Sequence, residues 1–284
     1  MQTFPNADDD FNKFLSPDNF QLAWRRIRNS TRLEVKDRLS LKIFSGDLNA
    51  HIEILIDELK NNQFIPASAE HIYAPKKSRT LRPFPFLGMR DRLVYQALGN
   101  IIIRNSLAYM RLYTNVQVFS PVVQSEDSDF IFENTKSTKN RPGQFKKFVD
   151  AIKSTKHDPS FHFFVRADIS AFYPSIDHSL LFSQLEKYQW LSSPALLDLL
   201  KRCLEAWSST DNTLKFQRGV PIGYETSDIL GSLFLWELDK SLVKHCKVLR
   251  YVDDMYLFTS TKSEAIYALM QLDLALQHRL LNLP

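Results

Sequence analysis

Hydrophobic residues in the first 65 positions recur at the spacing of one helix face. Phe20, Trp24 and Ile27 follow the i, i+4, i+7 pattern, which is typical of an amphipathic helix. A second run with the same period extends from about 48 to 59. The N-terminal part of the chain, residues 1–65, is therefore predicted to be a helical extension.

The pattern changes between residues 71 and 87, which include three prolines. Proline has no backbone N–H and fixes φ, so a helix is excluded here and an extended ribbon is expected. Residues 91–108 return to helical spacing. The polar, turn-rich stretch from 120 to 160 predicts a surface insertion with one short helix near 145–152.

Beyond residue 160, short apolar runs alternate with helical patterns. The run Phe163–Val165 predicts a strand buried on both faces, and residues 246–260 predict a hairpin whose bend holds Val-Asp-Asp. This order of elements predicts an α+β fold in which helices back an antiparallel sheet. We expect further helices near 177–188, 194–207, 227–243 and 263–280.

The composition is that of a globular protein with a buried core. The 284 residues are 44% hydrophobic and 24% charged. No apolar run reaches the ~18 residues of a membrane span, and the acidic N-terminus lacks the layout of a signal peptide. We therefore expect a cytoplasmic protein with no membrane partner. Cys203 and Cys246 are too few for a zinc site and suit a reducing compartment.

Positive charge is concentrated in one segment. The net charge is only +4, but six cations and a single acid lie between Lys76 and Arg92. Such a local excess suits phosphate groups and predicts a nucleotide or nucleic-acid partner. The alternative is a solvated basic face without a ligand.

Three carboxylates stand at the ends of apolar strands. Asp168 ends the strand that begins near 161, and Asp253 and Asp254 lie at the bend of the hairpin. Ionised carboxylates beside a packed sheet repel each other and are costly unless they are paired or bind a metal. Mg²⁺ prefers oxygen ligands, and a pair of such ions catalyses nucleotidyl transfer. A plain Asp-Asp turn and a solvated strand end are the alternatives.

Three sequence blocks in a fixed order resemble one polymerase family. RADISAFYPSID, RGVPIGYETSDILGSLFL and LRYVDDMYLF are similar to palm motifs A, B and C of reverse transcriptases. YAPKKSRTLRPFPF is similar to their fingers motifs. The resemblance covers about residues 60–284 and implies a right-hand polymerase fold, with fingers over 66–160 and palm over 161–284. The form of motif B is most similar to prokaryotic abortive-infection (Abi) and related defence-associated reverse transcriptases.

The resemblance implies a set of metal ligands. Asp168 and Asp253 would hold the catalytic Mg²⁺ ions, for which Mn²⁺ is a substitute. Asp254 would be a weaker or conditional ligand, and the backbone carbonyl of Ile169 would complete a metal shell. The implied activity is that of an RNA-directed DNA polymerase, with the three aspartates as its catalytic residues.

The resemblance also implies residues that bind the nucleotide. Lys76 and Arg82 would grip the incoming triphosphate, because both side chains suit phosphate oxygens; Lys77 is the alternative to Lys76. Gly223 would let the backbone approach the nucleotide or the template, although a turn glycine before a helix explains it equally well.

Tyr173 matches the bulky residue that excludes a ribose 2′-hydroxyl in this family. It stands five residues after Asp168, and a ring at this place would favour dNTPs over NTPs. The neighbouring Phe172 is the alternative gate, and its other interpretation is simple core packing.

Two departures from the family pattern affect the expected function. Ile222 stands where templated enzymes have glutamine, and it can pack but cannot hydrogen-bond near a templating base. This weakens the expectation of faithful template copying. The resemblance to the defence-associated enzymes adds the hypothesis of untemplated or protein-primed DNA synthesis in anti-phage defence. The chain also stops within what resembles motif D, so the thumb is expected to be absent or truncated. A C-terminal helical region outside this chain or a homo-oligomer is then an expected partner, besides an RNA template or a DNA product.

Two other functions stay open. One is a templated reverse transcriptase of retron or group II intron type, which would copy a supplied RNA. The other is a truncated palm module that binds nucleic acid without turnover. The three carboxylates are all present, which favours an enzyme over such a module.

Overall fold

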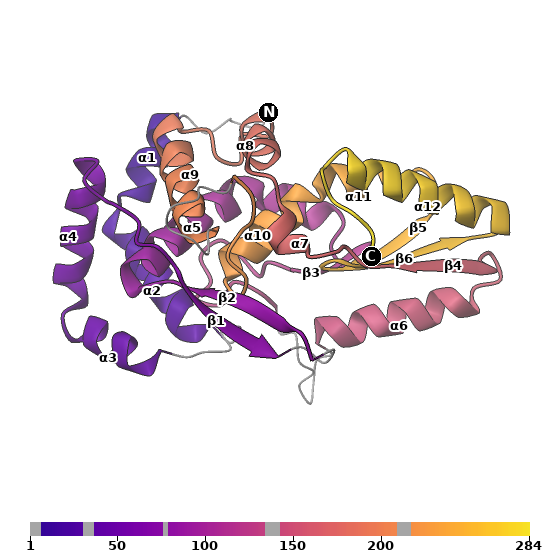
Figure 1. Cartoon of the computed structure of the whole chain (residues 1–284), viewed down its shortest axis with the longest axis horizontal. Coiled ribbons are helices and arrows are strands. Elements are labelled where there is room, and N and C mark those ends of the chain that lie inside the picture. Colours follow the sequence, from indigo (N-terminus) through magenta and orange to yellow (C-terminus); the bar gives the residue numbers. More distant parts are fainter. Residues whose placement is uncertain (1–6, 31–36, 76–78, 134–142, 209–216) are drawn as a thin grey trace. The chain divides into compact units, whose positions relative to one another are not determined.

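The chain forms two compact units, each assembled from separate stretches of sequence. This computed structural model describes residues 7–30, 37–75, 79–133, 143–208 and 217–284 (Figure 1). The first unit holds Met1–Ser106, Glu126–Phe130 and His178–Ser227, and the second holds Leu107–Ser125, Ile131–Asp177 and Asp228–Pro284. Among the described helices, none has both the length and the apolar character needed to cross a membrane.

Helices dominate the first unit. The α2 helix begins after Ser16, whose hydroxyl accepts the Asn19 N–H at 3.3 Å and so caps the helix. Phe20, Trp24 and Ile27 are buried, which confirms the predicted apolar face. The helices near the N-terminus of the chain are α1 (Ala7–Phe14), α2 (Pro17–Asn29), α3 (Arg38–Gly46) and α4 (Leu48–Lys60). Two later helices, α8 (His178–Lys187) and α9 (Pro194–Ser208), also belong to this unit.

A two-stranded sheet follows these N-terminal helices in the chain. β1 (Glu70–Pro75) pairs antiparallel with β2 (Leu81–Phe86), and Pro75 lies opposite Leu81. The predicted extended ribbon is thus confirmed. Prolines lack the N–H of a ladder hydrogen bond, so they are tolerated in strands that have only one neighbour. Helix α5 (Met89–Leu112) comes next and is longer at both ends than expected.

The second unit is built on a four-stranded sheet with the strand order β3-β5-β6-β4. β3 runs parallel to β5, while β5–β6 and β6–β4 are antiparallel. The predicted hairpin is confirmed and supplies the two central strands. The four strands are β3 (Val118–Ser120), β4 (Phe163–Ala167), β5 (Lys247–Tyr251) and β6 (Asp254–Thr259).

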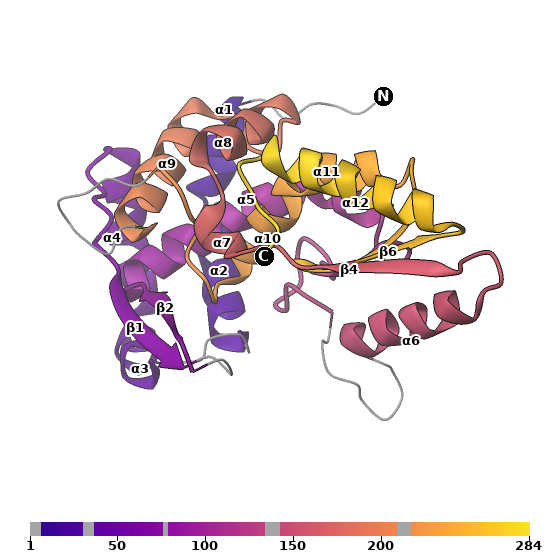
Figure 2. The same ribbon diagram turned by 45° about the vertical axis from the view of Figure 1, so that its right-hand side comes forward.

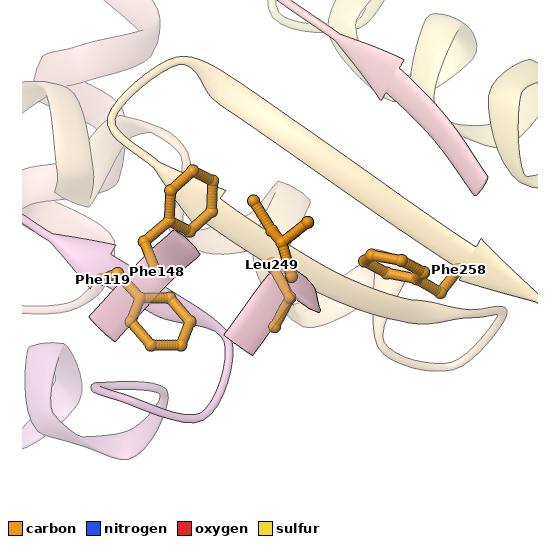
Figure 3. Close-up of a cluster of buried hydrophobic side chains, with 5 residues drawn as sticks. Phe119, Phe148, Leu249 and Phe258 are labelled. Atoms are coloured by element: carbon orange, nitrogen blue, oxygen red, sulfur yellow. The ribbon is translucent and has the colours of Figure 1, made fainter. Parts of the chain in front are cut away.

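Helices lie on both sides of this sheet. α6 (Gln144–His157) lies along one side and α12 (Lys262–Gln277) along the other in both views (Figures 1 and 2). Phe148 and Ile152 of α6 join Phe119, Leu249 and Phe258 of the sheet in a buried cluster (Figure 3). This packing gives the sheet its hydrophobic core on the α6 side.

Two expectations about the second unit are wrong. β4 is an edge strand, and its Phe163 and Phe164 are 41% and 47% exposed instead of buried on both faces. The expected helix over 227–243 divides into α10 (Glu225–Phe234) and α11 (Trp236–Leu242). The backbone of Leu235 between them has φ −84° and ψ −1°, which departs from regular helical geometry.

The stretch from 120 to 160 is more than a surface insertion. Val122, Val123 and Ile131 are buried, and α6 is longer than the short helix that was expected. Its turn-rich composition concealed these apolar positions because they are spaced too irregularly to show a helical or strand period.

Candidate functional site

The sheet of the second unit brings two of the predicted carboxylates side by side. β4 pairs with β6 so that Ala167 lies opposite Met255. Extending this antiparallel register by one residue places Asp168 opposite Asp254, because the two residue numbers of each pair keep the same sum. Directly opposite residues point to the same face of a sheet. The two carboxylates therefore share one face at the end of neighbouring strands.

Asp253 lies in the tight turn of the same hairpin. β5 and β6 are joined by Val252 and Asp253, and Tyr251 pairs with Asp254 on either side of them. Val252 has φ +59°, which is a genuine outlier for a β-branched residue. Such strain persists only where the surroundings hold it, and it is concentrated at functional sites.

Hydrogen bonds hold the strained turn from both sides. The Val252 N–H donates to the Ser120 carbonyl at 3.2 Å, and Arg250 Nη1 donates to the Val252 carbonyl at 2.9 Å. Arg250 is itself fixed by Asp239 of α11, with Nε 2.8 Å from Oδ1, and both side chains are almost fully buried. Burial raises the pKa of Asp239, while Arg250 opposes that shift.

The negative charge of Asp254 acts on the neighbouring Asp168. The pKa of Asp168 is raised, first by partial burial and then by the neighbouring Asp254 carboxylate. The Ile169 N–H opposes this shift by hydrogen-bonding the Asp168 carboxylate. Arg166 Nη2 lies 3.1 Å from Asp254 Oδ1, so a cation already balances part of the negative charge.

The residues at these strand ends fit a divalent cation. Two adjacent carboxylates that repel each other are the hard oxygen ligands that Mg²⁺ and Mn²⁺ prefer, and a cation between them would remove the repulsion. Over the described residues, however, no three His, Cys, Asp or Glu side chains are gathered as metal ligands would be. The metal roles of Asp168, Ile169, Asp253 and Asp254 stay predictions.

Tyr173 and Phe172 occupy the short helix α7 (Phe172–Ser175), which follows the carboxylate end of β4. Phe172 is 3% exposed, whereas Tyr173 is half-buried and its hydroxyl donates to Asp228 Oδ1 at 2.5 Å. Only the tyrosine retains an accessible surface that a substrate could meet. Tyr173 is thus the more accessible of the two rings, and its role as the gate stays a prediction.

The residues predicted to bind the triphosphate belong to the first unit. Arg82 lies in β2 opposite Ala74 and is exposed, while Lys76 and its alternative Lys77 lie outside the described residues. Gly223 has φ +97°, a conformation that L side chains rarely adopt. A tight turn before a helix requires this backbone geometry, and so does a close approach of the backbone to a nucleotide or template. The geometry therefore does not distinguish between these two interpretations of Gly223.

A tyrosine next to Gly223 fixes this loop within the first unit. The Tyr224 hydroxyl accepts the Leu87 N–H at 2.8 Å and donates to the Pro85 carbonyl at 3.1 Å. Burial raises the pKa of Tyr224, which keeps its hydroxyl protonated and able to donate. The loop is thereby tied to the end of β2.

Sequence reasoning missed three residues: Arg166, which pairs with Asp254, and Asp228 and Gly231, which contact α7. Arg166 stands two positions before Asp168, and the period of two along a strand, which puts both on one face, could have revealed it. Asp228 and Gly231 belong to α10 and meet α7 only through tertiary packing. Spacing along the chain carries no signal for such contacts.

Comparison with known proteins settles the family. A family model described as reverse transcriptase (RNA-dependent DNA polymerase) matches residues 74–283. The chain belongs to the reverse transcriptase family. The order of motifs A, B and C in the sequence predicted this membership, and it is confirmed.

Curated relatives of this reverse transcriptase are distant and longer. Protein YkfC of Escherichia coli (strain K12) is 24% identical over 213 residues, which are 72% of this chain and 49% of YkfC. The group II intron-encoded protein LtrA of Lactococcus lactis subsp. cremoris is 24% identical over 248 residues, which are 84% of this chain and 36% of LtrA. The chain thus spans half or less of the length of these relatives.

A solved structure shares the fold of this reverse transcriptase. Telomerase from Candida albicans, in complex with a fragment of telomeric RNA, matches with a TM-score of 0.50 and 13% identity. The match covers 77% of this chain and 42% of that one. It bears on the fold alone, and the predicted α+β fold of polymerase fingers and palm is confirmed.

Proposed function

We propose that this chain carries the catalytic centre of an RNA-directed DNA polymerase that joins dNTPs to a growing DNA strand. The observation that carries the proposal is the pairing of β4 with β6, which sets Asp168 opposite Asp254 beside the strained Val252–Asp253 turn. Within this proposal the fingers comprise residues 66–160 and the palm comprises 161–284, after an N-terminal extension over 1–65.

The carboxylates would hold the divalent ions of the reaction. Asp168, Asp253 and the Ile169 carbonyl would be the main ligands, and Asp254 a conditional one, because Arg166 already engages it. Bound Mg²⁺ or Mn²⁺ supplies activation of the attacking 3′-hydroxyl and stabilisation of the pyrophosphate leaving group. A bond forms between the 3′-oxygen and the α-phosphorus as the bond to pyrophosphate breaks.

Other residues would bind and select the nucleotide. Lys76 and Arg82 would neutralise the triphosphate, and the positive φ of Gly223 would allow a close approach of its backbone. Tyr173 would occupy the space that a ribose 2′-hydroxyl needs. The substrate class that follows is the dNTP.

The template requirement divides the proposal into two forms. Ile222 and the PIGYETS form of motif B support an untemplated or protein-primed enzyme of the abortive-infection type, acting in anti-phage defence. The similarity to the group II intron-encoded protein LtrA supports a templated enzyme that copies RNA. An oligomer or a C-terminal helical region would complete the binding of nucleic acid in either form.

A binding measurement and a synthesis assay test the proposal together. Calorimetry should show Mg²⁺-dependent dNTP binding that Asp168→Asn and Asp253→Asn abolish. Asp150→Asn, which removes an exposed charge on α6, is the matched control and should bind as the wild type does. Equal binding by all four proteins, or none by the wild type, would remove the catalytic assignment and favour a non-catalytic module.

Synthesis is then compared with and without a primed RNA template. Product formed from dNTPs and Mg²⁺ alone supports the untemplated form. Product that appears only with the primed RNA supports the templated form.

A further inference from the structure

We propose that Asp228 and Gly231 of α10 are positioning residues that set the place of the Tyr173 ring and thereby the choice of dNTP over NTP. This inference rests on the proposed polymerase function. Residues 228 and 231 are three apart and therefore lie on the same face of a helix. That face meets α7, since both residues contact its aromatic pair.

Asp228 holds the outer end of the gate ring. The Tyr173 hydroxyl donates to Asp228 Oδ1, and Asp228 is only 6% exposed. A carboxylate that is enclosed by protein cannot turn outward into solvent. It therefore provides a fixed hydrogen-bond acceptor for the Tyr173 hydroxyl.

Gly231 provides the space in which the ring lies. A Cβ added at Gly231 would lie 3.0 Å from Phe172 Cε1 and 3.3 Å from Tyr173 Cε1. Glycine inside a helix is less favourable than alanine. Its presence in α10 is explained by the two rings, which pack against the helix where a side chain would otherwise be.

Phe172 supports the inner side of the gate. Its ring centroid lies 5.1 Å from that of Tyr173 at an angle of 51°, and its side chain is buried. The tyrosine ring is thus fixed by a hydrogen bond at its hydroxyl, by a neighbouring ring and by the gap at Gly231. A ring can select the sugar only if it stays in place when the nucleotide binds. These contacts prevent the Tyr173 ring from moving away.

The test measures kcat/KM for dNTPs and NTPs, together with their binding affinities by calorimetry. Asp228→Ala and Tyr173→Phe each remove one end of the hydrogen bond, and we expect each to lower the preference for dNTP roughly tenfold. Asp228→Asn keeps an oxygen acceptor and should preserve most of the preference. Asp228→Ala combined with Tyr173→Phe should be no worse than either change alone, because both act on one bond.

Gly231→Ala tests the second contact. It should displace the ring and lower the preference for dNTP while the hydroxyl and its acceptor are both present. Asp150→Asn is again the control, and thermal unfolding shows which variants fold. If Asp228→Ala does not fold, Tyr173→Phe and Asp228→Asn decide the question.

The outcomes separate this inference from the proposed function. A wild type that incorporates no nucleotide overturns the polymerase proposal itself. A working polymerase in which Tyr173→Ala relaxes sugar choice, but Asp228→Ala, Tyr173→Phe and Gly231→Ala do not, overturns only the positioning role. Loss of preference in these variants with rescue by Asp228→Asn supports it.

Discussion

Replacing Asp239 with leucine should destabilise the protein by roughly 3–5 kcal/mol, because a buried guanidinium would lose its charge partner. The side chains of Arg250 and Asp239 are 1% and 2% exposed. They are joined at two points, Nε to Oδ1 at 2.8 Å and Nη2 to Oδ2 at 2.5 Å. Neither group can regain water without opening the packing between α11 and β5.

Replacing both partners should cost much less. In Asp239→Leu with Arg250→Met no charge remains to be compensated, and exchanges of a whole buried pair for apolar residues are often neutral. The double variant still lacks the bond from Arg250 Nη1 to the Val252 carbonyl. A residual loss of roughly 1–3 kcal/mol is therefore expected, since that carbonyl is left without this donor.

Urea unfolding measures these differences, provided that the slope of the transition is unchanged. Asp150→Leu is the control, because its exposed pair with Lys146 on α6 should contribute only about 0.3–0.5 kcal/mol. Two results would refute the reasoning. One is an Asp239→Leu protein within about 1 kcal/mol of wild type, and the other is a double variant as unstable as that single one.

Three further predictions address other positions in the two units. Burial raises the pKa of Asp91, so the folded state holds a proton that the unfolded chain releases. The stability of wild type relative to Asp91→Asn should therefore fall as pH rises above about 4 through the raised pKa. Thermal unfolding at pH 4 and pH 8 checks this, and a stability difference that does not change with pH contradicts it. Gly99→Ala should destabilise the first unit by roughly 1–3 kcal/mol, because its Cβ would lie 2.4 Å from Thr226 Oγ1, and addition of Thr226→Ala should recover part of this loss in urea unfolding. Val252→Gly should stabilise the fold by up to about 1 kcal/mol by relieving the positive φ, and a lower melting temperature would show that the turn is not strained.

Local patterns predicted the elements that local physics determines. The apolar face of α2 and the hairpin that ends in Asp253 and Asp254 both follow from side-chain period and turn chemistry. The adjacency of Asp168 to this hairpin followed from the motif order of the family. Predicting this adjacency required no knowledge of side-chain contacts.

Features that depend on three-dimensional neighbours could not be predicted in this way. The exposure of Phe164 reflects the place of β4 at the sheet edge, and an apolar run does not reveal which strand is outermost. The bond from Tyr173 to Asp228 joins residues 55 positions apart. A buried aspartate in a helix has many interpretations until its partner is seen.

The discontinuous make-up of the two units has a practical consequence for fragment design. Residues near 100, 128 and 200 all contribute to the first unit, and the second combines stretches near 120, 160 and 260. No single cut in the gene separates the two units from each other. A ribosome must also synthesise the chain to about residue 227 before the first unit has all its parts, so neither unit can finish folding early in translation.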